Sequence, residues 1–317
     1  MAKYALKRVL LLIPTLLLVC VIVFVLLRTV PGSAVDYMIY QFQTAGVTVD
    51  QAQVEHMLGM DKPAVVQFFD WFTGIFQGDL GESLFQAEGV WDIISRQLPV
   101  TLELGILTLL FSNMISIPLG IFCAARQDSV SDYLIRIISV LLLSLPVFWI
   151  ATIVLVYPAV WFGYAPPMTY VPFFTNPAEN MKMFLVPALL GAFTQAGMQL
   201  RTIRTMTLET MRQDYIRTCW AKGVGETQIL FIHALRNSMI PIITMIGGSV
   251  AGLVGGSVIL ETMFNMPGIG AQVVAALDMR DYPLVQGCVL VFSIFVMVVN
   301  LIVDLTYKWI DPRVELE

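Results

Sequence analysis

The run VLLLIPTLLLVCVIVFVLL, residues 9–27, contains no charged side chain. Its 19 residues would form an α-helix about 28 Å long, close to the thickness of the hydrocarbon core of a bilayer. Three basic residues lie within the first eight positions, and Arg28-Thr29-Val30-Pro31 follows the run. A cleavable secretory signal has a shorter apolar region and ends in small residues. The run therefore predicts a first transmembrane helix that the protein retains.

The composition supports a membrane location for much of the chain. Of the 317 residues, 57% are hydrophobic and only 13% are charged, and the mean hydropathy is +0.79. Soluble domains carry about 25% charged residues, so lipid must cover much of this surface. The four cysteines lie in apolar stretches or in a basic segment, and this placement predicts no disulfide framework. They are Cys20, Cys123, Cys219 and Cys288.

Five further apolar windows follow the first one, and the only charged residue inside them is Glu103. The fourth of the six windows is 17 residues long, at the short end of the range for a membrane-spanning helix. The pattern predicts an all-α integral membrane protein with six transmembrane helices. The five windows are 98–125, 137–162, 184–200, 238–260 and 282–303.

The distribution of positive charge predicts the orientation. If all six windows span the membrane, thirteen of the eighteen Lys and Arg residues fall on the side of the N-terminus. Cytoplasmic loops carry the excess of positive charge, so both termini are expected in the cytoplasm. The predicted organisation has four parts: an N-terminal tail and first helix (1–28), an external loop region (29–97), a transmembrane domain (98–304) and a cytoplasmic tail (305–317).

The external region 29–97 is acidic, with nine Asp and Glu residues against two bases. Within it, large apolar residues recur at helical spacing. They predict an amphipathic helix that packs on the bundle or lies among lipid headgroups, and direct contact with a substrate is the alternative. These residues are Val65, Phe68, Phe69, Phe72, Ile75 and Phe76.

The fifth window is rich in glycine. Gly248, Gly252 and Gly256 repeat every four residues on one helical face, and small residues at this spacing let helices approach closely. Close packing, within the chain or against another subunit, is the prediction, and a hinge is the alternative. The remaining glycines of the window are Gly247 and Gly255.

Catalytic patterns are missing from the sequence. It contains no Gly-x4-Gly-Lys-Ser/Thr phosphate loop and no Gly-x-Ser-x-Gly nucleophile elbow. The predicted topology places the two histidines, His56 and His233, on opposite sides of the membrane, so they predict no metal site. We therefore expect a non-catalytic protein without a cofactor or metal of its own, which does not bind nucleic acid.

Polar residues inside the windows are the candidates for a transport pathway, because burying them in lipid is costly. Helix–helix hydrogen bonding is the alternative role for each of them. Glu103 is predicted near the outer surface, and Asp304 near the inner end of the last span, where Lys308 can pair with it. An ion-driven transporter usually has an acidic residue or a histidine at the membrane midplane, so the lack of one there argues against ion-driven transport. The candidates are Glu103, Asn113, Gln195, Gln199 and Asn300.

A basic cytoplasmic segment, 201–236, separates the fourth and fifth windows. Asp214 is a good N-cap, Tyr215–Lys222 can form two helical turns, and Gly223 allows a left-handed C-terminal stop. A second amphipathic stretch follows and is expected to end near Pro241. A short capped helix between two spans could transmit force from a cytosolic partner, and a basic loop that binds anionic lipid is the alternative. The second stretch contains Ile229, Leu230, Phe231 and Leu235.

The segment 214–223, DYIRTCWAKG, followed by HALRNSMIP at 233–241, resembles the cytoplasmic loop of permease subunits of peptide/nickel-type ABC importers. Arg217-Thr218-Cys219 stands where importers in general carry Glu-Ala-Ala, and Gly223 matches their glycine. Further similar motifs are GDLGES at 78–83, LPVTLEL at 98–104, ETMFNMPGIG at 261–270, RDYPLVQG at 280–287 and DPR at 311–313. The resemblance assigns coupling to an ATPase to Asp214, Tyr215, Ile216, Arg217, Thr218, Cys219, Trp220, Ala221, Lys222 and Gly223.

This resemblance covers nearly the whole chain and implies a type I ABC importer permease in a bacterial inner membrane. Its expected partners are a second homologous permease, two cytosolic ATPases that bind ATP and Mg, and an external solute-binding protein. The long loop after the first span is similar to the oligopeptide-permease-B type. Substrates across the wider family include dipeptides, oligopeptides, nickel chelates, glutathione, opines and oligosaccharides. The alternatives are a secondary transporter or channel without an ATPase, and an intramembrane enzyme.

Overall fold

The computed structural model describes residues 2–225 and 228–310, and helices make up most of this part of the chain. Its β-structure is a single isolated bridge between Glu82 and Gly89. The chain divides into two compact units, Met1–Val100 with Pro267–Val298 (unit 1) and Thr101–Met266 with Val299–Glu317 (unit 2). The predicted all-α architecture is confirmed for the described residues.

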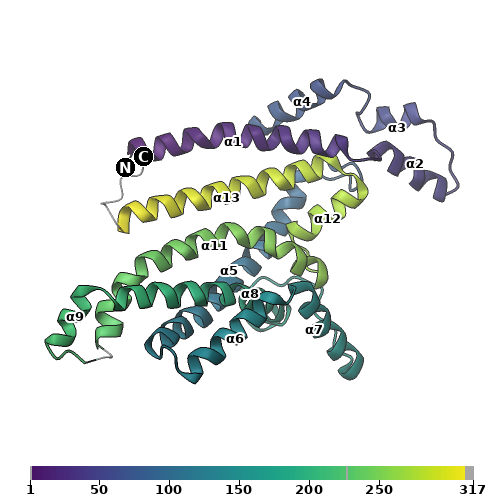
Figure 1. Ribbon diagram of the computed structural model, residues 1–317. Helices are drawn as coiled ribbons and strands as arrows, with labels where there is room; N and C mark the ends of the chain where they lie inside the picture. Colours follow the sequence, from purple (N-terminus) through teal and green to yellow (C-terminus); the bar gives the residue numbers. More distant parts are fainter. Residues whose placement is uncertain (1, 226–227, 311–317) are drawn as a thin grey trace. The chain divides into compact units, whose positions relative to one another are not determined.

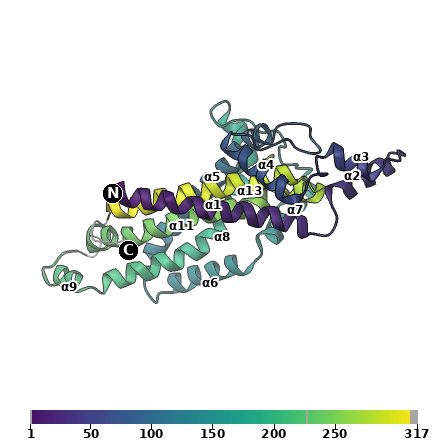
Figure 2. The ribbon, with the colours of Figure 1, turned by 90° about the horizontal axis from the view of Figure 1, so that it is seen from above.

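Unit 1 contains four N-terminal helices, the beginning of α5, and two helices from the end of the chain (Figure 1). Helices α1 and α13 lie side by side, and residues from both enter the core of the unit. α2 and α3 project from the end of α1 (Figure 2). The helices are α1 (Ala2–Thr29), α2 (Ala34–Thr44), α3 (Gln51–Met57), α4 (Ala64–Phe76), α5 (Val90–Ala125), α12 (Ile269–Met279) and α13 (Tyr282–Ile310).

The core of unit 1 is built where these helices approach most closely. A Cβ atom added to Gly287 on α13 would lie 2.4 Å from Cγ1 of Val90 on α5, so only glycine permits this contact. Asp281, which precedes α13, is buried and accepts a hydrogen bond from the Ser83 hydroxyl at 2.5 Å. Buried contacts thus tie the loop before α5 to the start of α13.

The amphipathic helix predicted in the external region is confirmed as α4. Phe68, Phe72 and Ile75 pack against the core of unit 1, and the rings of Phe68 and Phe24 lie 5.1 Å apart. Val65, Phe69 and Phe76 lie on its exposed side. Half of the predicted apolar set therefore packs within the chain.

A capping box starts α2. The Ser33 hydroxyl accepts a hydrogen bond from the Asp36 backbone, and the Ser33 backbone donates to the Asp36 carboxylate. These hydrogen bonds hold the pKa of Asp36 below its ordinary value, since they stabilise the charged form.

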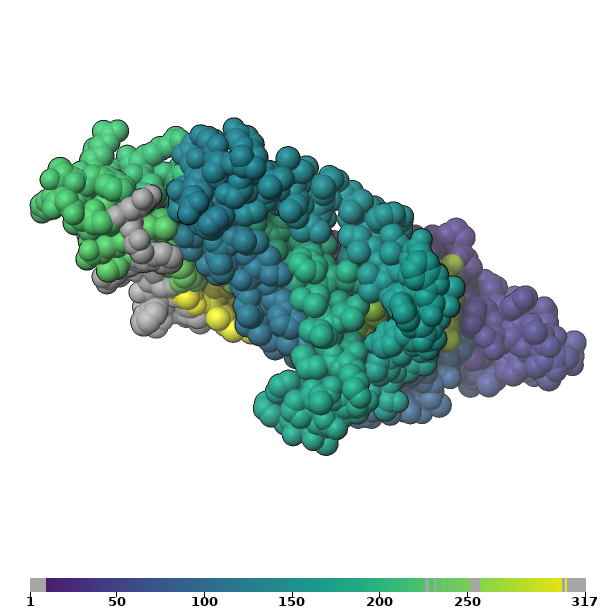
Figure 3. Space-filling model, turned by 90° about the horizontal axis from the view of Figure 1, so that it is seen from below, coloured from purple at the N-terminus to yellow at the C-terminus, as the bar shows by residue number. Residues whose placement is uncertain are grey.

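Unit 2 contains the rest of α5, α6 (Val130–Ser144), α7 (Val147–Phe162), α8 (Pro177–Met211), α9 (Asp214–Ala221), the π-helix η1 (Ile229–Ala234) and α11 (Leu235–Met263). α8 packs against α6, α7 and α11. A Cβ atom on Gly197 of α8 would lie 2.9 Å from the Ser139 carbonyl oxygen of α6. Side chains of α6 and α7 form much of the surface of unit 2 seen in Figure 3.

The predicted third span, 137–162, is not one straight helix. α6 and α7 meet at an angle of 89°, and Leu145 between them has an extended backbone. The cause is Pro146, because a proline disfavours the helical conformation in the residue before it. An uncharged window identified the segment correctly but could not reveal the bend.

Among the described residues, four helices are long and apolar enough to cross a membrane, and the count is five if the bent pair of α6 and α7 forms one span. They correspond to the first four predicted windows and the last one. The remaining window, 238–260, lies in α11, where the described residues provide a shorter apolar stretch, Asn237–Val250. The count of six therefore stays a prediction.

A buried ion pair joins α6 to α8. The fully buried Asp132 carboxylate accepts hydrogen bonds from Nε and Nη2 of Arg204 at 2.8 and 2.7 Å. Arg136 lies 3.7 Å from the same carboxylate, and the Ser129 hydroxyl caps α6. Bidentate guanidinium–carboxylate contacts fix orientation as well as distance, so this pair sets how the two helices align.

Candidate functional site

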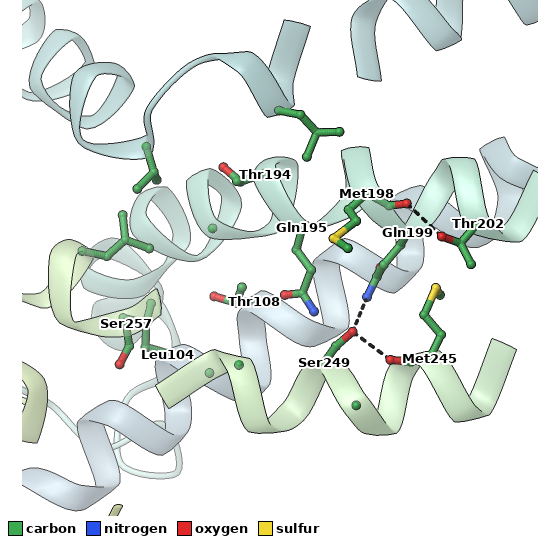
Figure 4. Close-up of a pocket in the computed structure, with 17 residues that line it drawn as sticks. Leu104, Thr108, Thr194, Gln195, Met198, Gln199, Thr202, Met245, Ser249 and Ser257 are labelled. Atoms are coloured by element: carbon green, nitrogen blue, oxygen red, sulfur yellow. Dashed lines mark hydrogen bonds between the residues drawn. The ribbon is translucent and has the colours of Figure 1, made fainter. Parts of the chain in front are cut away.

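A cavity of about 570 Å³ lies inside unit 2, between α5, α6, α7, α8 and α11 (Figure 4). None of its lining residues carries a charge. The apolar part of the lining includes Leu104, Leu143, Val147, Met198, Met245 and Leu260. The polar side chains are Thr108, Thr194, Gln195, Gln199, Thr202, Ser249 and Ser257.

A chain of hydrogen bonds crosses the cavity wall from α5 to α11. The buried Ser116 hydroxyl donates to Oε1 of Gln199 at 2.9 Å, and Nε2 of Gln199 donates to the Ser249 hydroxyl at 3.4 Å. Ser249 in turn donates to the Met245 carbonyl at 2.9 Å. These bonds fix Gln199, whereas Gln195, one turn earlier on α8, points toward α11 (Figure 4).

Two predicted pathway residues, Gln195 and Gln199, therefore lie at the cavity, and the other three do not line it.

The other three predicted pathway residues have different surroundings. Glu103 accepts a hydrogen bond at 3.1 Å from the Tyr170 hydroxyl, and burial together with this bond raises the pKa of Tyr170. Asn113 donates to the Leu109 carbonyl of its own helix at 2.7 Å. Asn300 is exposed on α13. Asp304 and Lys308 lie outside the described side chains.

The glycine face predicted on α11 is only partly a packing surface. A Cβ atom on Gly247 would lie 2.6 Å from Cγ1 of Val303, so this glycine is closely packed. Gly248 and Gly252 line the cavity instead, and no atom lies within 4 Å of the Cβ position of either. Close packing within the chain is therefore not found at these two residues, and close packing against another subunit stays a prediction. Gly255 and Gly256 lie outside the residues whose surroundings are described.

Several lining residues were missed, although the sequence contains a signal for them. Met245, Gly248, Ser249 and Gly252 follow the spacing of one helical face, and small and polar residues share it. Thr194, Met198 and Thr202 repeat every four residues beside the two glutamines on α8. Thr108 could not be predicted in this way, because no pattern in its neighbouring residues marks it and only the packing of α5 against the other helices brings it to the cavity.

The short helix predicted between the fourth and fifth windows is present as α9, with a shifted beginning, and its role in coupling to an ATPase stays a prediction. Gln213 is the N-cap and has an extended backbone, and Asp214 is the first helical residue rather than the cap. The Asp214 carboxylate accepts a hydrogen bond from Arg217 instead. The shift arises because α8 ends at Met211 and leaves Gln213 to start the next helix.

The predicted glycine stop of α9 is confirmed. Gly223 has a φ of +74°, its N–H donates to the Trp220 carbonyl, and the Val224 N–H donates to the Cys219 carbonyl. This is the Schellman arrangement, in which a left-handed residue satisfies the last carbonyls of a helix.

One face of α9 is attached to the beginning of α11. Ile216 is fully buried against Ile229 and Ala234 of η1. Asn237 of α11 donates to the Tyr215 hydroxyl at 2.8 Å. The opposite face leaves Arg217, Thr218, Trp220 and Lys222 exposed, so α9 offers a free surface while it is joined to two long helices.

The second amphipathic stretch does not end at Pro241 as predicted. η1 leads directly into α11, and Pro241 lies inside that helix. Prolines are tolerated within helices of membrane bundles because neighbouring groups compensate for the lost backbone hydrogen bond. η1 therefore links the end of the α9 segment to a single long helix.

Apolar spanning helices, an uncharged internal cavity and a capped helix on a basic loop together define a membrane transport subunit. The chain belongs to the family of binding-protein-dependent transport system inner membrane components, whose model matches residues 116–316. A model for the N-terminal part of such membrane components matches residues 1–105. The chain is thus an inner-membrane permease component.

Three relatives cover 99% of this chain and 99% of their own length. One is a Brucella suis protein provisionally named as a peptide transport system permease protein, with 36% identity over 314 residues. Another is the di/tripeptide transport system permease protein DppB of Pseudomonas aeruginosa, with 33% identity over 334 residues. The third is the glutathione transport system permease protein GsiC of Salmonella typhimurium, with 35% identity over 317 residues.

Proposed function

We propose that this chain carries short peptides or peptide-like solutes through the cavity of unit 2, as one of two homologous permease subunits of an ABC importer. The observation that carries the proposal is the polar surface of Gln195 and Ser249 in an uncharged cavity, with the buried Gln199 holding Ser249 in place. Peptides repeat amide donors and acceptors, which glutamine and serine side chains can bind. The names of the full-length relatives point to the same cargo class.

The cavity chemistry also suits release. Absence of charge from the lining means that no ion pair must be broken when a zwitterionic peptide leaves. Amide hydrogen bonds exchanged for those of water contribute only about 0.5–1.5 kcal/mol each to binding. Such weak contacts favour passage over retention, and tight selection then belongs to the external solute-binding protein.

Uptake by the reconstituted complex tests the cargo proposal. Gln195→Ala and Gln199→Ala should each lower the rate of dipeptide uptake in proteoliposomes several-fold. Asn300→Ala, on the exposed side of α13, is the matched control and should transport like the wild type. The proposal fails if the glutamine variants transport normally, or if the control loses as much activity as they do.

The second part of the proposal is that α9 couples this chain to a cytosolic ATPase. Its exposed Arg217 and Trp220 offer contacts to a partner, while Ile216 and Tyr215 hold the helix against η1 and α11. This chain is then non-catalytic, and ATP and Mg bind in the partner subunits. Both termini lie on the cytoplasmic side in this arrangement.

Substitutions on the exposed face of α9 and at its C-terminal stop test coupling. Arg217→Glu changes an exposed side chain, so it should abolish peptide-stimulated ATP hydrolysis while the protein still inserts into the membrane. Gly223→Pro should do the same by breaking the left-handed stop. Full coupling in both variants would contradict the role of α9, and loss only in vesicles with anionic lipid would identify a lipid-binding loop instead.

The acidic outer segment supports docking of a solute-binding protein. Eight of its nine acids are exposed, and only two bases lie in the segment. Reversing several of these acids should weaken stimulation of ATP hydrolysis by the binding protein, most strongly at low salt, because salt screens exposed charges. Unchanged stimulation at low and high salt would exclude this docking surface.

A further inference from the structure

A second cavity, of about 300 Å³, lies inside unit 1. Its walls come from the end of α1, the turn before α4, α4 itself, the loop before α5 and the start of α13. Phe24, Trp71 and Tyr282 contribute aromatic surface to it. The volume is at the lower end of the range of roughly 300–1,000 Å³ that small-molecule sites occupy.

Arg28 lines this cavity without an acidic partner among the described residues. Its Nη2 donates to Oε1 of Gln67 at 2.5 Å, Nη1 donates to the Phe24 carbonyl at 3.4 Å, and Cζ lies 3.5 Å from the centre of the Phe24 ring. All three contacts are with neutral groups. A guanidinium has five N–H donors, so Arg28 keeps a full charge and further donors for another group.

Two more donors at the same cavity lack an acceptor. Nε2 of Gln286, a residue that is 4% exposed, and Nε1 of Trp71 have no hydrogen-bond partner among the described residues. Buried N–H groups are nearly always paired in native proteins, with protein, water or a ligand. Two orphaned donors beside one unpaired guanidinium indicate that an acceptor-rich group completes the site.

The acids at the cavity do not supply this acceptor. Asp70 binds Lys62 at 2.8 Å, and Oδ1 of Asp79 accepts a hydrogen bond from the Gly81 backbone at 2.8 Å. Their negative charge also disfavours a ligand with several charges, such as a phosphate. A single planar carboxylate matches one guanidinium in both charge and geometry.

We propose that the cavity of unit 1 is a binding site for the carboxylate group of a small solute. Arg28 holds the carboxylate, Gln286 and Trp71 complete its hydrogen bonding, and the aromatic walls enclose the rest of the molecule. The carboxylate can belong to a free small acid or to the C-terminus of a short peptide. The site is separate from the uncharged cavity of unit 2 in both residues and chemistry.

Titration of the full-length chain in zwitterionic nanodiscs tests this site. Sodium acetate should produce saturable heat and raise the melting temperature, and sodium chloride at equal ionic strength should not. Gly-Gly should bind as well, whereas Gly-Gly amide, which lacks the free carboxylate, should bind at least tenfold more weakly. Binding of acetate alone identifies free acids as the ligand, and binding of Gly-Gly with higher affinity identifies peptide C-termini.

Three variants separate binding from folding. Arg28→Gln should weaken acetate binding at least tenfold, and Arg280→Gln, a matched change in a residue that donates to the Pro31 carbonyl, should leave it unchanged. Gln286→Leu should weaken binding several-fold yet keep or raise the melting temperature of the empty protein, since it removes an unpaired buried donor. The proposal would be overturned if chloride bound as well as acetate, or if Gly-Gly amide bound as well as Gly-Gly. Unaltered acetate affinity in Arg28→Gln and Gln286→Leu would overturn it too.

Discussion

The cavities of the two units differ in charge. The cavity of unit 2 has no charged lining residue, whereas that of unit 1 is lined by Arg28, Lys62, Asp70 and Asp79. Unit 2 does contain a buried ion pair, between Asp132 of α6 and Arg204 of α8, but neither residue lines the cavity. The difference teaches that one chain can keep one internal surface free of charged side chains and line another with them, which is why we propose passage through the first and recognition in the second.

The largest expected effect concerns the buried pair. Asp132→Ala removes the only carboxylate that Arg204 contacts in the described residues, and leaves an uncompensated charge. Breaking a buried pair in this way costs about 3–5 kcal/mol. The free energy of unfolding, measured by denaturant titration in micelles, should fall by this amount. Asp278→Ala, an exposed position on α12, should leave it nearly unchanged, and equal losses would refute a special role for the pair.

Two neighbouring glycines on α11, Gly247 and Gly248, allow a packed position and a cavity position to be compared on the same helix. Gly247→Ala places a methyl group 2.6 Å from Val303 and should lower stability by about 1–3 kcal/mol, as overpacking does. Gly248→Ala meets no atom within 4 Å, so it should fold normally but slow the uptake of large peptides more than that of small ones. Thermal unfolding and uptake rates distinguish the two. The account is contradicted if Gly248→Ala changes stability and leaves cargo size preference unaltered.

The smallest effect is expected at an exposed pair of unit 1. Arg96 pairs with Glu88, and both side chains are largely exposed. Exposed pairs contribute about 0–1 kcal/mol, so Arg96→Ala should hardly change the unfolding midpoint. A loss as large as that of Asp132→Ala would mean that the charges of unit 1 are structural, and the contrast between the units would disappear.

Much of the fold could be predicted from the sequence, because hydrophobic windows and capping residues act locally. The windows located α1, α5, α8 and α13, and Gly223 marked the end of α9. The bend between α6 and α7 was not predicted, because an uncharged window contains no information on it, although the Leu145-Pro146 pair that causes it is visible in the sequence.

The cavity was less accessible, because it depends on which helix faces meet. Gln195 and Gln199 were found as polar residues in an apolar span. Nothing local distinguishes Gly248, which faces open space, from Gly247, which meets Val303. Asn113 and Glu103 looked equally polar in the sequence, but the fold turns them to other partners.

Protection of a single cysteine by cargo tests the central claim most directly. Gln195→Cys is introduced in the assembled transporter with the four native cysteines, Cys20, Cys123, Cys219 and Cys288, replaced by Ser. Its labelling by a small thiol reagent is followed with and without peptide during ATP turnover. The account predicts that peptide slows labelling of Cys at position 195 and leaves an Asn300→Cys control unaffected. Labelling of both positions at the same rate with and without peptide would contradict a peptide path through the cavity of unit 2.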